Sequence, residues 1–258
     1  MKKLMVRKVK EYIKRQFSKI HDYLIKDKIV KETLFSSNTT TYKMLRGFNV
    51  LFSFLIWIPV VGSFWSLNLP HFLGYMMAAV AVYSTWIFEW VTKSTILEEL
   101  RTITIAQITA HSLFGMYFEF YNNYEYYDDI LHITGGMWLA MIVFPIILGT
   151  ELTFSRQKLN SLVWKINIFT FSIAITLGTM WEIGEFLSDQ IFWSYPGYRL
   201  AQENSLYDTM TDLIYDASGA VFGIMLFWNI IRSLNKNRNM LLLLESIGKA
   251  LRNFVNMK

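Results

Sequence analysis

The stretch YDDILHITGGMWLAMIVFPIILG, at residues 127–149, decides the fold class of this chain. After its paired aspartates it runs on for about twenty residues with a single ionisable side chain, His132. A helix of about 20 apolar residues is long enough to cross the ~30 Å hydrocarbon layer of a membrane. The sequence therefore predicts a transmembrane helix over 130–149, with Asp128 and His132 at one end of it.

Further apolar segments of similar length lie on both sides of this one, at roughly 47–67, 71–91, 102–122, 164–188 and 211–232. The composition agrees, because 53% of the 258 residues are hydrophobic and 17% are aromatic. We therefore expect an all-α protein, a polytopic membrane helical bundle with six transmembrane helices in one domain, 47–232. The chain contains no Cys, which excludes disulfides, thiolate ligands and cysteine nucleophiles.

Both ends of the chain are basic and have helical periodicity. Residues 1–46 place Met5, Val9 and Ile13 at four-residue steps between Lys and Arg side chains, and residues 233–258 follow a similar pattern. We expect amphipathic basic helices that lie on the inner leaflet of the membrane. Soluble helices packed on the inner loops are the alternative.

The distribution of charge predicts the topology. With six spans, every one of the 25 Lys and Arg residues except Arg199 falls on the same side of the membrane. Cytoplasmic loops carry the Lys and Arg excess, so both termini are expected in the cytoplasm. The net charge of +5 lies beside apolar spans, which favours membrane lipids as partners and not nucleic acid.

Acidic and histidine side chains gather at the opposite, extracytoplasmic end of the predicted spans. Asp128 and His132 are four residues apart and share a helix face, as do Glu182 and Glu185, which are three apart. The candidate metal ligands are His111, Asp128, His132, Glu182, Glu185, Asp208 and Asp212, and Asp216 continues the last stripe by one more step. Ionisable groups inside apolar spans are costly and need partners, so this convergence predicts a site.

Three arrangements would relieve the repulsion among these carboxylates: protonation, a water-filled cavity, or a bound cation. The mixture of His, Asp and Glu favours a divalent metal ion. Zn, Mn or Fe would suit it, or Mg or Ca if oxygen ligands dominate. The simpler interpretations are that His111 is a packing residue and that Asp128 and Asp208 only cap helices.

The sequence also predicts structural roles for residues near the site. Gly135, Gly136 and Gly219 are small enough to let two helices approach closely, which would bring Asp128 and His132 near Asp212. Asp189, Glu125 and Glu203 are expected to be solvated loop charges.

Four elements of this sequence resemble the YjdF-like group of small multi-pass bacterial inner-membrane proteins. They are His111, YYDDILHITGG at 126–136, WEIGEF at 181–186 and YDTMTDLIYDASGA at 207–220. The order and approximate spacing agree over about 100–220. The resemblance implies a bacterial cell membrane protein. A looser similarity links Asp212, Asp216 and Gly219 to VanZ-like proteins, although Asp216 stands where that family has Asn.

Three classes of function remain open from the sequence. The favoured one is a metal-dependent enzyme, a hydrolase or transferase, that acts on a lipid or a lipid-linked envelope substrate with His132, Glu182 and Glu185 as catalytic residues. A proton- or cation-coupled transporter would also use acids and His inside the membrane. The third is a non-catalytic membrane module that binds a lipid or drug in an outer cavity.

Overall fold

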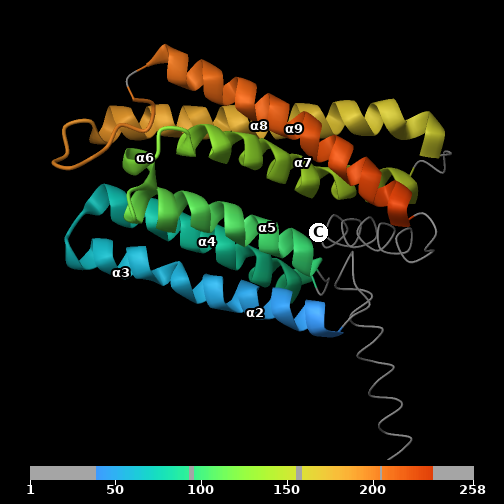
Figure 1. Cartoon of the computed structure of the whole chain (residues 1–258), viewed down its shortest axis with the longest axis horizontal. Helices are drawn as coiled ribbons and strands as arrows, with labels where there is room; N and C mark the ends of the chain where they lie inside the picture. The colour runs from blue at the N-terminus through green and yellow to red at the C-terminus, as the bar shows by residue number, and fades with distance from the viewer. Residues whose placement is uncertain (1–38, 93–95, 155–158, 204, 235–258) are drawn as a thin grey trace, which may run out of the picture.

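The computed structural model describes residues 39–92, 96–154, 159–203 and 205–234, and Figure 1 shows how their helices are arranged. The elements in chain order are α2 (Thr39–Leu55), α3 (Trp57–Trp65), α4 (Leu69–Thr92), α5 (Glu98–Thr109), the π-helix η1 (Ala110–Tyr117), α6 (Phe120–Asn123), α7 (Tyr127–Phe154), α8 (Leu159–Phe192) and α9 (Leu206–Leu234). No strand occurs in these ranges, which confirms the all-α class for the part described. The predicted amphipathic terminal helices lie largely outside the described residues.

Five helical stretches are long and apolar enough to cross a membrane. They are Thr40–Trp65, Leu69–Val91, Tyr127–Glu151, Val163–Phe192 and Leu206–Ile230. Each overlaps one of the predicted spans. The first combines α2 and α3, which are interrupted at Ile56 because Pro59 has no N–H to donate to the carbonyl of Leu55.

The remaining predicted span, 102–122, is not among these five. It falls on α5, η1 and the start of α6, and the continuous helix that we expected there is broken. Glu119 adopts a left-handed backbone conformation (φ 60°), which ends the helix and turns the chain into α6. α5 begins with charged residues, including Glu98 and Arg101, so apolar composition alone does not identify it as a span.

The helices form two halves that lie side by side along the long axis of the molecule (Figure 1). One half contains α2 to α5 and the other contains α7 to α9. Side-chain hydrogen bonds join α5 to α7 across the boundary. Nε2 of Gln107 donates to the carbonyl of Leu131 at 2.9 Å, and Nε1 of Trp138 donates to Oγ1 of Thr104 at 3.0 Å.

A buried ion-pair network explains how the polar start of α5 fits inside the first half. Arg101 is fully buried, and its Nη2 lies 2.5 Å from a carboxylate oxygen of Glu89 on α4. Glu98, also fully buried, pairs at 2.5 Å with Arg46 on α2. Both guanidinium groups lie over the ring of Trp86, at 3.8 and 4.4 Å from its centroid. The network therefore ties α2, α4 and α5 together at one end of the bundle.

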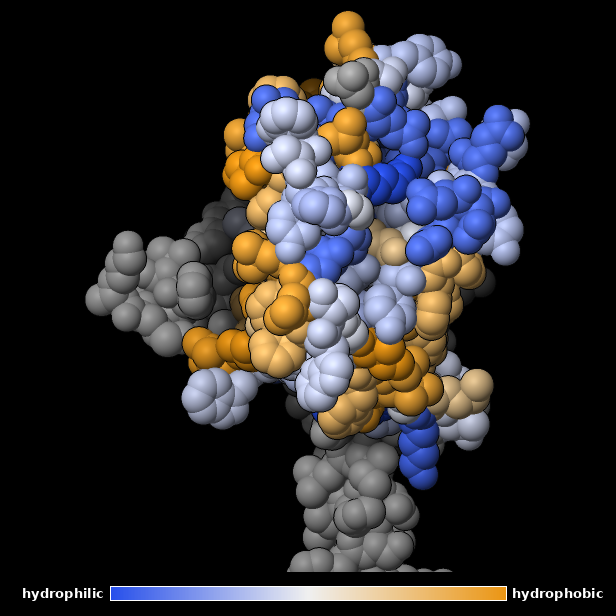
Figure 2. Space-filling model, turned by 90° about the vertical axis from the view of Figure 1, so that its left-hand side faces the viewer, coloured by the Kyte–Doolittle hydropathy of each residue, from blue (hydrophilic) through white to orange (hydrophobic). Residues whose placement is uncertain are grey.

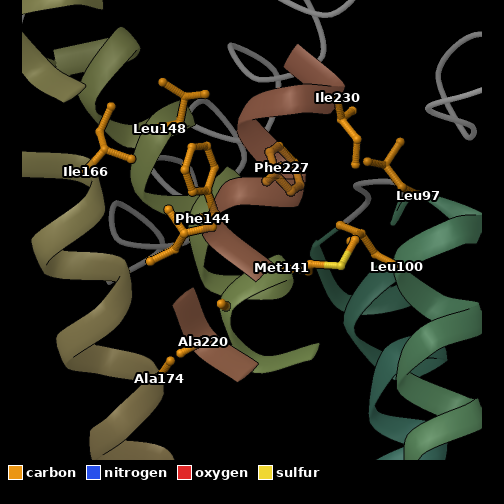
Figure 3. Close-up of a cluster of buried hydrophobic side chains, with 12 residues drawn as sticks. Leu97, Leu100, Met141, Phe144, Leu148, Ile166, Ala174, Ala220, Phe227 and Ile230 are labelled. Atoms are coloured by element: carbon orange, nitrogen blue, oxygen red, sulfur yellow. The ribbon is translucent and has the colours of Figure 1, made fainter. Parts of the chain in front are cut away.

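The α7–α9 pair forms the centre of the second half, and glycines let its two backbones touch. A Cβ atom at Gly136 would overlap the carbonyl oxygen of Asp216, and one at Gly219 would overlap the carbonyl oxygen of Ile133. The expected close approach at Gly136 and Gly219 is thus confirmed. Further along the same pair, Phe144 and Phe227 stack with ring centroids 4.7 Å apart in the apolar core (Figure 3).

Candidate functional site

The candidate site lies at the end of the second half where α7 and α9 begin and α8 ends. Asp128 and His132 occupy the first two turns of α7, and Glu182 lies in the last third of α8. Asp212 and Asp216 follow one another at a four-residue step on α9. We call these five residues the His132 cluster. Figure 2 views this end of the molecule and shows hydrophilic residues gathered over its upper part, where α8, α9 and their connecting loop lie.

The imidazole of His132 is at the centre of the cluster, and each of its ring nitrogens faces two carboxylates. Nε2 lies 3.6 Å from Oδ1 of Asp128 and 3.8 Å from Oδ1 of Asp212. Nδ1 lies 3.4 Å from Oδ1 of Asp216 and 3.9 Å from Oε1 of Glu182. Three helices therefore place four acids around one base, as the sequence predicted for Asp128, Asp212 and Glu182.

The cluster is shielded from solvent on most sides. His132 is 7% exposed, Glu182 and Asp212 are 3% exposed, and Asp216 is 5% exposed. The Asp128 side chain, at 24%, is the most accessible member and marks the side on which the cluster opens. Within the described part of the chain, no Lys or Arg forms an ion pair with any of the four carboxylates.

The carboxylate of Glu182 is buried without a hydrogen-bond donor in the part of the chain described. Neither of its carboxylate oxygens accepts a hydrogen bond from a described residue, although the side chain is almost fully buried. Gln202 donates instead to the backbone carbonyl of Glu182, at 3.2 Å. A buried carboxylate without donors costs several kcal/mol of desolvation, on the order of the penalty for an unpaired buried ion. A proton or a bound cation would remove this cost.

Asp216 is the site residue that our candidate ligand set left out. It makes the shortest contact of any carboxylate with His132. Its side chain fits there because the facing positions are glycines: a Cβ at Gly178 on α8 would overlap its carboxylate, and a Cβ at Gly135 on α7 would lie 3.9 Å from it. The four-residue step from Asp212 was the available signal.

The donor atoms of Asp128, His132 and Asp212 are close enough to share a metal ion, since all three lie within 4.8 Å of one another. This group combines one imidazole nitrogen with two carboxylate oxygens. Such a set suits borderline to hard divalent cations. It contains three of the seven predicted ligands.

His111 and Glu185 lie among aromatic residues next to the cluster. Glu185 forms no ion pair with His132. Oε1 of Glu185 accepts a hydrogen bond of 2.8 Å from Nε1 of Trp181. His111, in the first turn of η1, lies with its ring centroid 5.0 Å from that of Trp181, and its Nδ1 is 2.6 Å from the hydroxyl of Tyr121. The structure thus divides the predicted residues between two adjoining groups.

Asp208 lies in the first turn of α9, one helical step before Asp212. Its backbone N–H reaches Oγ of Ser205 at 3.4 Å, and the residue is half-buried. It forms no ion pair with His132, so it stays at the margin of the cluster.

Asp189 is not the solvated loop charge that we expected. It is 6% exposed and holds the α8–α9 loop by accepting hydrogen bonds from the backbone N–H groups of Ala201 and Gln202, at 2.8 and 3.0 Å. Oδ1 also accepts a bond of 2.9 Å from the hydroxyl of Tyr198. Burial raises the pKa of Tyr198 to about 12, so this hydroxyl stays protonated as a donor. Glu125 and Glu203 are exposed, as expected.

The chain belongs to a family of predicted membrane proteins (DUF2238), whose model matches residues 44–233 and therefore includes the whole His132 cluster. It is also similar to an uncharacterised protein of Thermotoga maritima, with 28% identity over 165 residues, which is 64% of this chain and 80% of that protein. No solved structure is significantly similar to it. Together with the five apolar helices, family membership identifies an integral, multi-pass membrane protein.

Proposed function

We propose that this protein is a membrane enzyme whose His132 cluster binds a divalent cation and acts on a lipid or a lipid-linked envelope substrate. One observation carries the proposal: four carboxylates surround one buried imidazole, and no described Lys or Arg pairs with them. Like charges at this spacing repel strongly in a poorly solvated site. A divalent cation held by some of these carboxylates would offset that repulsion.

The geometry around Nε2 of His132 supports a ligand set of Asp128, His132 and Asp212. Donor atoms that bind one ion at about 2.1 Å lie roughly 3.0–3.5 Å apart from one another. The observed separations of 3.6 and 3.8 Å from Nε2 need only small side-chain movements to reach that range. Zn, Mn, Fe or Mg would fit such a set.

The other ring nitrogen supplies the orienting contact that metal-bound histidines commonly have. A histidine ligand usually donates its second N–H to a carboxylate, which fixes the tautomer and the ring orientation. Asp216, 3.4 Å from Nδ1, is placed for this role. We therefore assign Asp216 to orient the ring and leave Nε2 free for the cation.

Glu182 is the best placed proton acceptor. Its oxygens are free of hydrogen bonds, whereas Glu185, the other candidate, already accepts one from Trp181. A cation in the cluster would polarise a phosphoryl or acyl oxygen of the substrate. If water attacks, Glu182 would accept its proton and return it to the leaving group as the bond between that group and the phosphoryl or acyl centre breaks. Such general acid–base catalysis contributes about 10²–10⁴-fold in rate.

The topology proposed with this function has six spans, with α5 and η1 as the third. The hydroxyl of Tyr195, after α8, donates to the carbonyl of Leu67, before α4, at 3.0 Å. Segments that touch in this way lie on one side of the membrane, so the chain between them crosses an even number of times. Because α4, α7 and α8 supply three crossings, the contact supports α5–η1 as the fourth.

Six spans combine with the charge distribution to place the site. Every Lys and Arg except Arg199 then lies on one side, which is the cytoplasmic side by the positive-inside rule. The His132 cluster belongs to the same end as the α8–α9 loop, and so it would face the extracytoplasmic side of a bacterial cell membrane. Lipid headgroups and lipid-linked envelope precursors are the substrates present at that level.

The proposal is tested by lipid conversion. Purified protein, supplied with each candidate metal, is incubated with a total bacterial lipid extract, and the lipids are analysed by mass spectrometry. We expect at least one lipid class to be converted, and Glu182→Gln to slow the conversion at least about 100-fold. Glu151→Gln, at the opposite end of α7, is the control and should retain activity. An unchanged lipid profile with folded, metal-loaded protein would contradict the enzyme assignment.

A further inference from the structure

The α8–α9 loop is held firmly over the outer end of the protein. Asp189 fixes its second half through the N–H groups of Ala201 and Gln202. Tyr195 fixes its first half to the turn between α3 and α4, through the carbonyl of Leu67. The loop therefore bridges the two halves of the molecule and is a rigid support for any side chain that it carries.

Arg199 is the basic residue carried by this loop, and its guanidinium is only partly occupied. The group lies 5.0 Å from the centroid of the Tyr121 ring, and Nη2 donates to Oε1 of Glu203 at 2.6 Å. Among the described residues, Glu203 is the one acceptor that binds it. The guanidinium has five N–H donors, one of them bonds to Glu203, and the Arg199 side chain is 33% exposed, so it can donate to a ligand as well.

The pair with Glu203 is easily exchanged. The Glu203 side chain is 54% exposed, and exposed ion pairs contribute only about 0–1 kcal/mol. A phosphate group could accept two parallel hydrogen bonds from the planar guanidinium. The contact with Glu203 is a single hydrogen bond. Arg199 is thus positioned to bind an oxyanion through two hydrogen bonds.

Arg199 is also close to the His132 cluster. The ring of Tyr121, which Arg199 covers, packs against Tyr127 with centroids 5.3 Å apart, and Tyr127 directly precedes Asp128 at the accessible side of the cluster. Four carboxylates carry more negative charge than one divalent cation offsets. An anionic substrate would therefore be repelled unless a fixed positive group held it at the entrance. Arg199 is the one Lys or Arg of the sequence between Lys165 and Arg232.

We propose that Arg199 binds a phosphate group of the substrate at the entrance to the His132 cluster, which makes the substrate class a phosphate-bearing lipid. This inference rests on the proposed function, because it takes the cluster to be the reacting site. Tyr121 supports the guanidinium from behind, and Glu203 acts as its partner until the phosphate displaces it.

The test uses the full-length protein in detergent micelles, with phosphatidic acid as the probe and diacylglycerol of the same acyl chains as the phosphate-free comparison. We expect tighter binding of phosphatidic acid by the wild type and about tenfold weaker binding by Arg199→Gln, with partial rescue in Arg199→Lys. Glu203→Gln removes the competing acceptor from an exposed position, so it should bind phosphatidic acid more tightly. Lys165→Gln, which removes a cation at the far end of the bundle, should bind like the wild type.

Two further measurements, phosphate competition and metal content, distinguish the possible outcomes of the binding test. Competition by inorganic phosphate would identify a soluble phosphate ester as the source of the group, and its absence would identify the lipid headgroup; either supports the phosphate site. Equal affinities of wild type and Arg199→Gln for phosphatidic acid would overturn the inference. Metal content is measured on the same samples: a metal-loaded protein without Arg199 dependence defeats this inference alone, whereas a folded wild type without metal defeats the proposed function.

Discussion

At the residue scale, the site depends on which carboxylates face each ring nitrogen of His132. Nε2 faces Asp128 and Asp212, while Nδ1 faces Asp216 and Glu182. Only a neutral imidazole can bind a cation, and it then carries one N–H. In the proposed metal site, Asp216 would hold that proton on Nδ1 and would leave Nε2 to bind the cation.

This arrangement predicts a graded loss of metal affinity when Asp216 is changed. Asp216→Ala removes the acceptor of Nδ1–H and should weaken metal binding about 10–100-fold, as is typical for loss of an orienting carboxylate. Asp216→Asn keeps an oxygen acceptor of the same shape and should lose less. Isothermal titration of the purified variants measures both affinities, and the visible spectrum of the cobalt-substituted protein reports whether the ring still binds.

The control is Glu151→Gln, which removes a carboxylate from the far end of α7 and should leave metal affinity unchanged. If Asp216→Ala bound metal as tightly as the wild type and gave the same cobalt spectrum, Asp216 would have no orienting role.

Sequence spacing predicted part of the site and missed the rest for a geometric reason. Asp128 and His132, four residues apart, do converge, because that step advances a helix by only about 40°. Glu182 and Glu185 are three apart, which is a difference of about 60° around the axis of α8. Glu182 therefore faces His132 on α7, whereas Glu185 accepts a hydrogen bond within α8 from Trp181, whose ring packs against His111 of η1. Spacing within one helix does not say where its neighbours stand.

At the element scale, the close contact of α7 and α9 holds the cluster together. The contact depends on glycine because side chains at Gly136 or Gly219 would overlap the backbone of the opposite helix. Small residues at such positions are a general way for helices to approach inside a membrane. The sequence predicted this contact from the glycines alone, and the structure confirms it.

Gly219→Ala should therefore damage both stability and metal binding. The new methyl group would overlap the carbonyl of Ile133, and the forced separation of α7 from α9 should cost about 1–3 kcal/mol. Because Asp212 and Asp216 would move away from His132 with α9, metal content should fall too. Thermal unfolding in detergent and elemental analysis of the same preparation measure the two effects.

Gly184→Ala is the matched control, since nothing lies within 4 Å of a Cβ at that position on α8. It should unfold at or slightly above the wild-type temperature, because alanine favours helix by up to about 1 kcal/mol. Equal unfolding temperatures and equal metal contents of the Gly219 and Gly184 variants would contradict a close contact between the backbones of α7 and α9.

At the scale of the whole molecule, the sequence predicted six apolar spans. Five of them lie on helices that are long and apolar enough to cross a membrane, and 102–122, on α5 and η1, does not. Glu98 and Arg101 make α5 polar by composition, yet both are fully buried in ion pairs with α2 and α4. Hydropathy counts a paired, buried charge as though it were solvated. The predicted span therefore began at 102, after these charges, whereas α5 begins at Glu98 and ends at Thr109, where η1 follows.

The six-span topology predicts that the α3–α4 turn and the α8–α9 loop are exposed on one side of the membrane. The cysteine-free sequence allows single cysteines to be labelled without background. A membrane-impermeant maleimide should label Ser66→Cys and Glu203→Cys in intact cells, and Lys43→Cys only after lysis. Labelling of Ser66→Cys with protection of Glu203→Cys would instead indicate five crossings.

The central claim is that the His132 cluster binds a metal ion, and elemental analysis of the detergent-purified protein tests it most directly. We predict one divalent metal ion per chain in the wild type and its loss from His132→Ala and from Asp212→Asn, with unfolding temperatures showing that both variants remain folded. Absence of metal from folded wild-type protein, even after supplementation with Zn, Mn, Fe and Mg, would contradict the account.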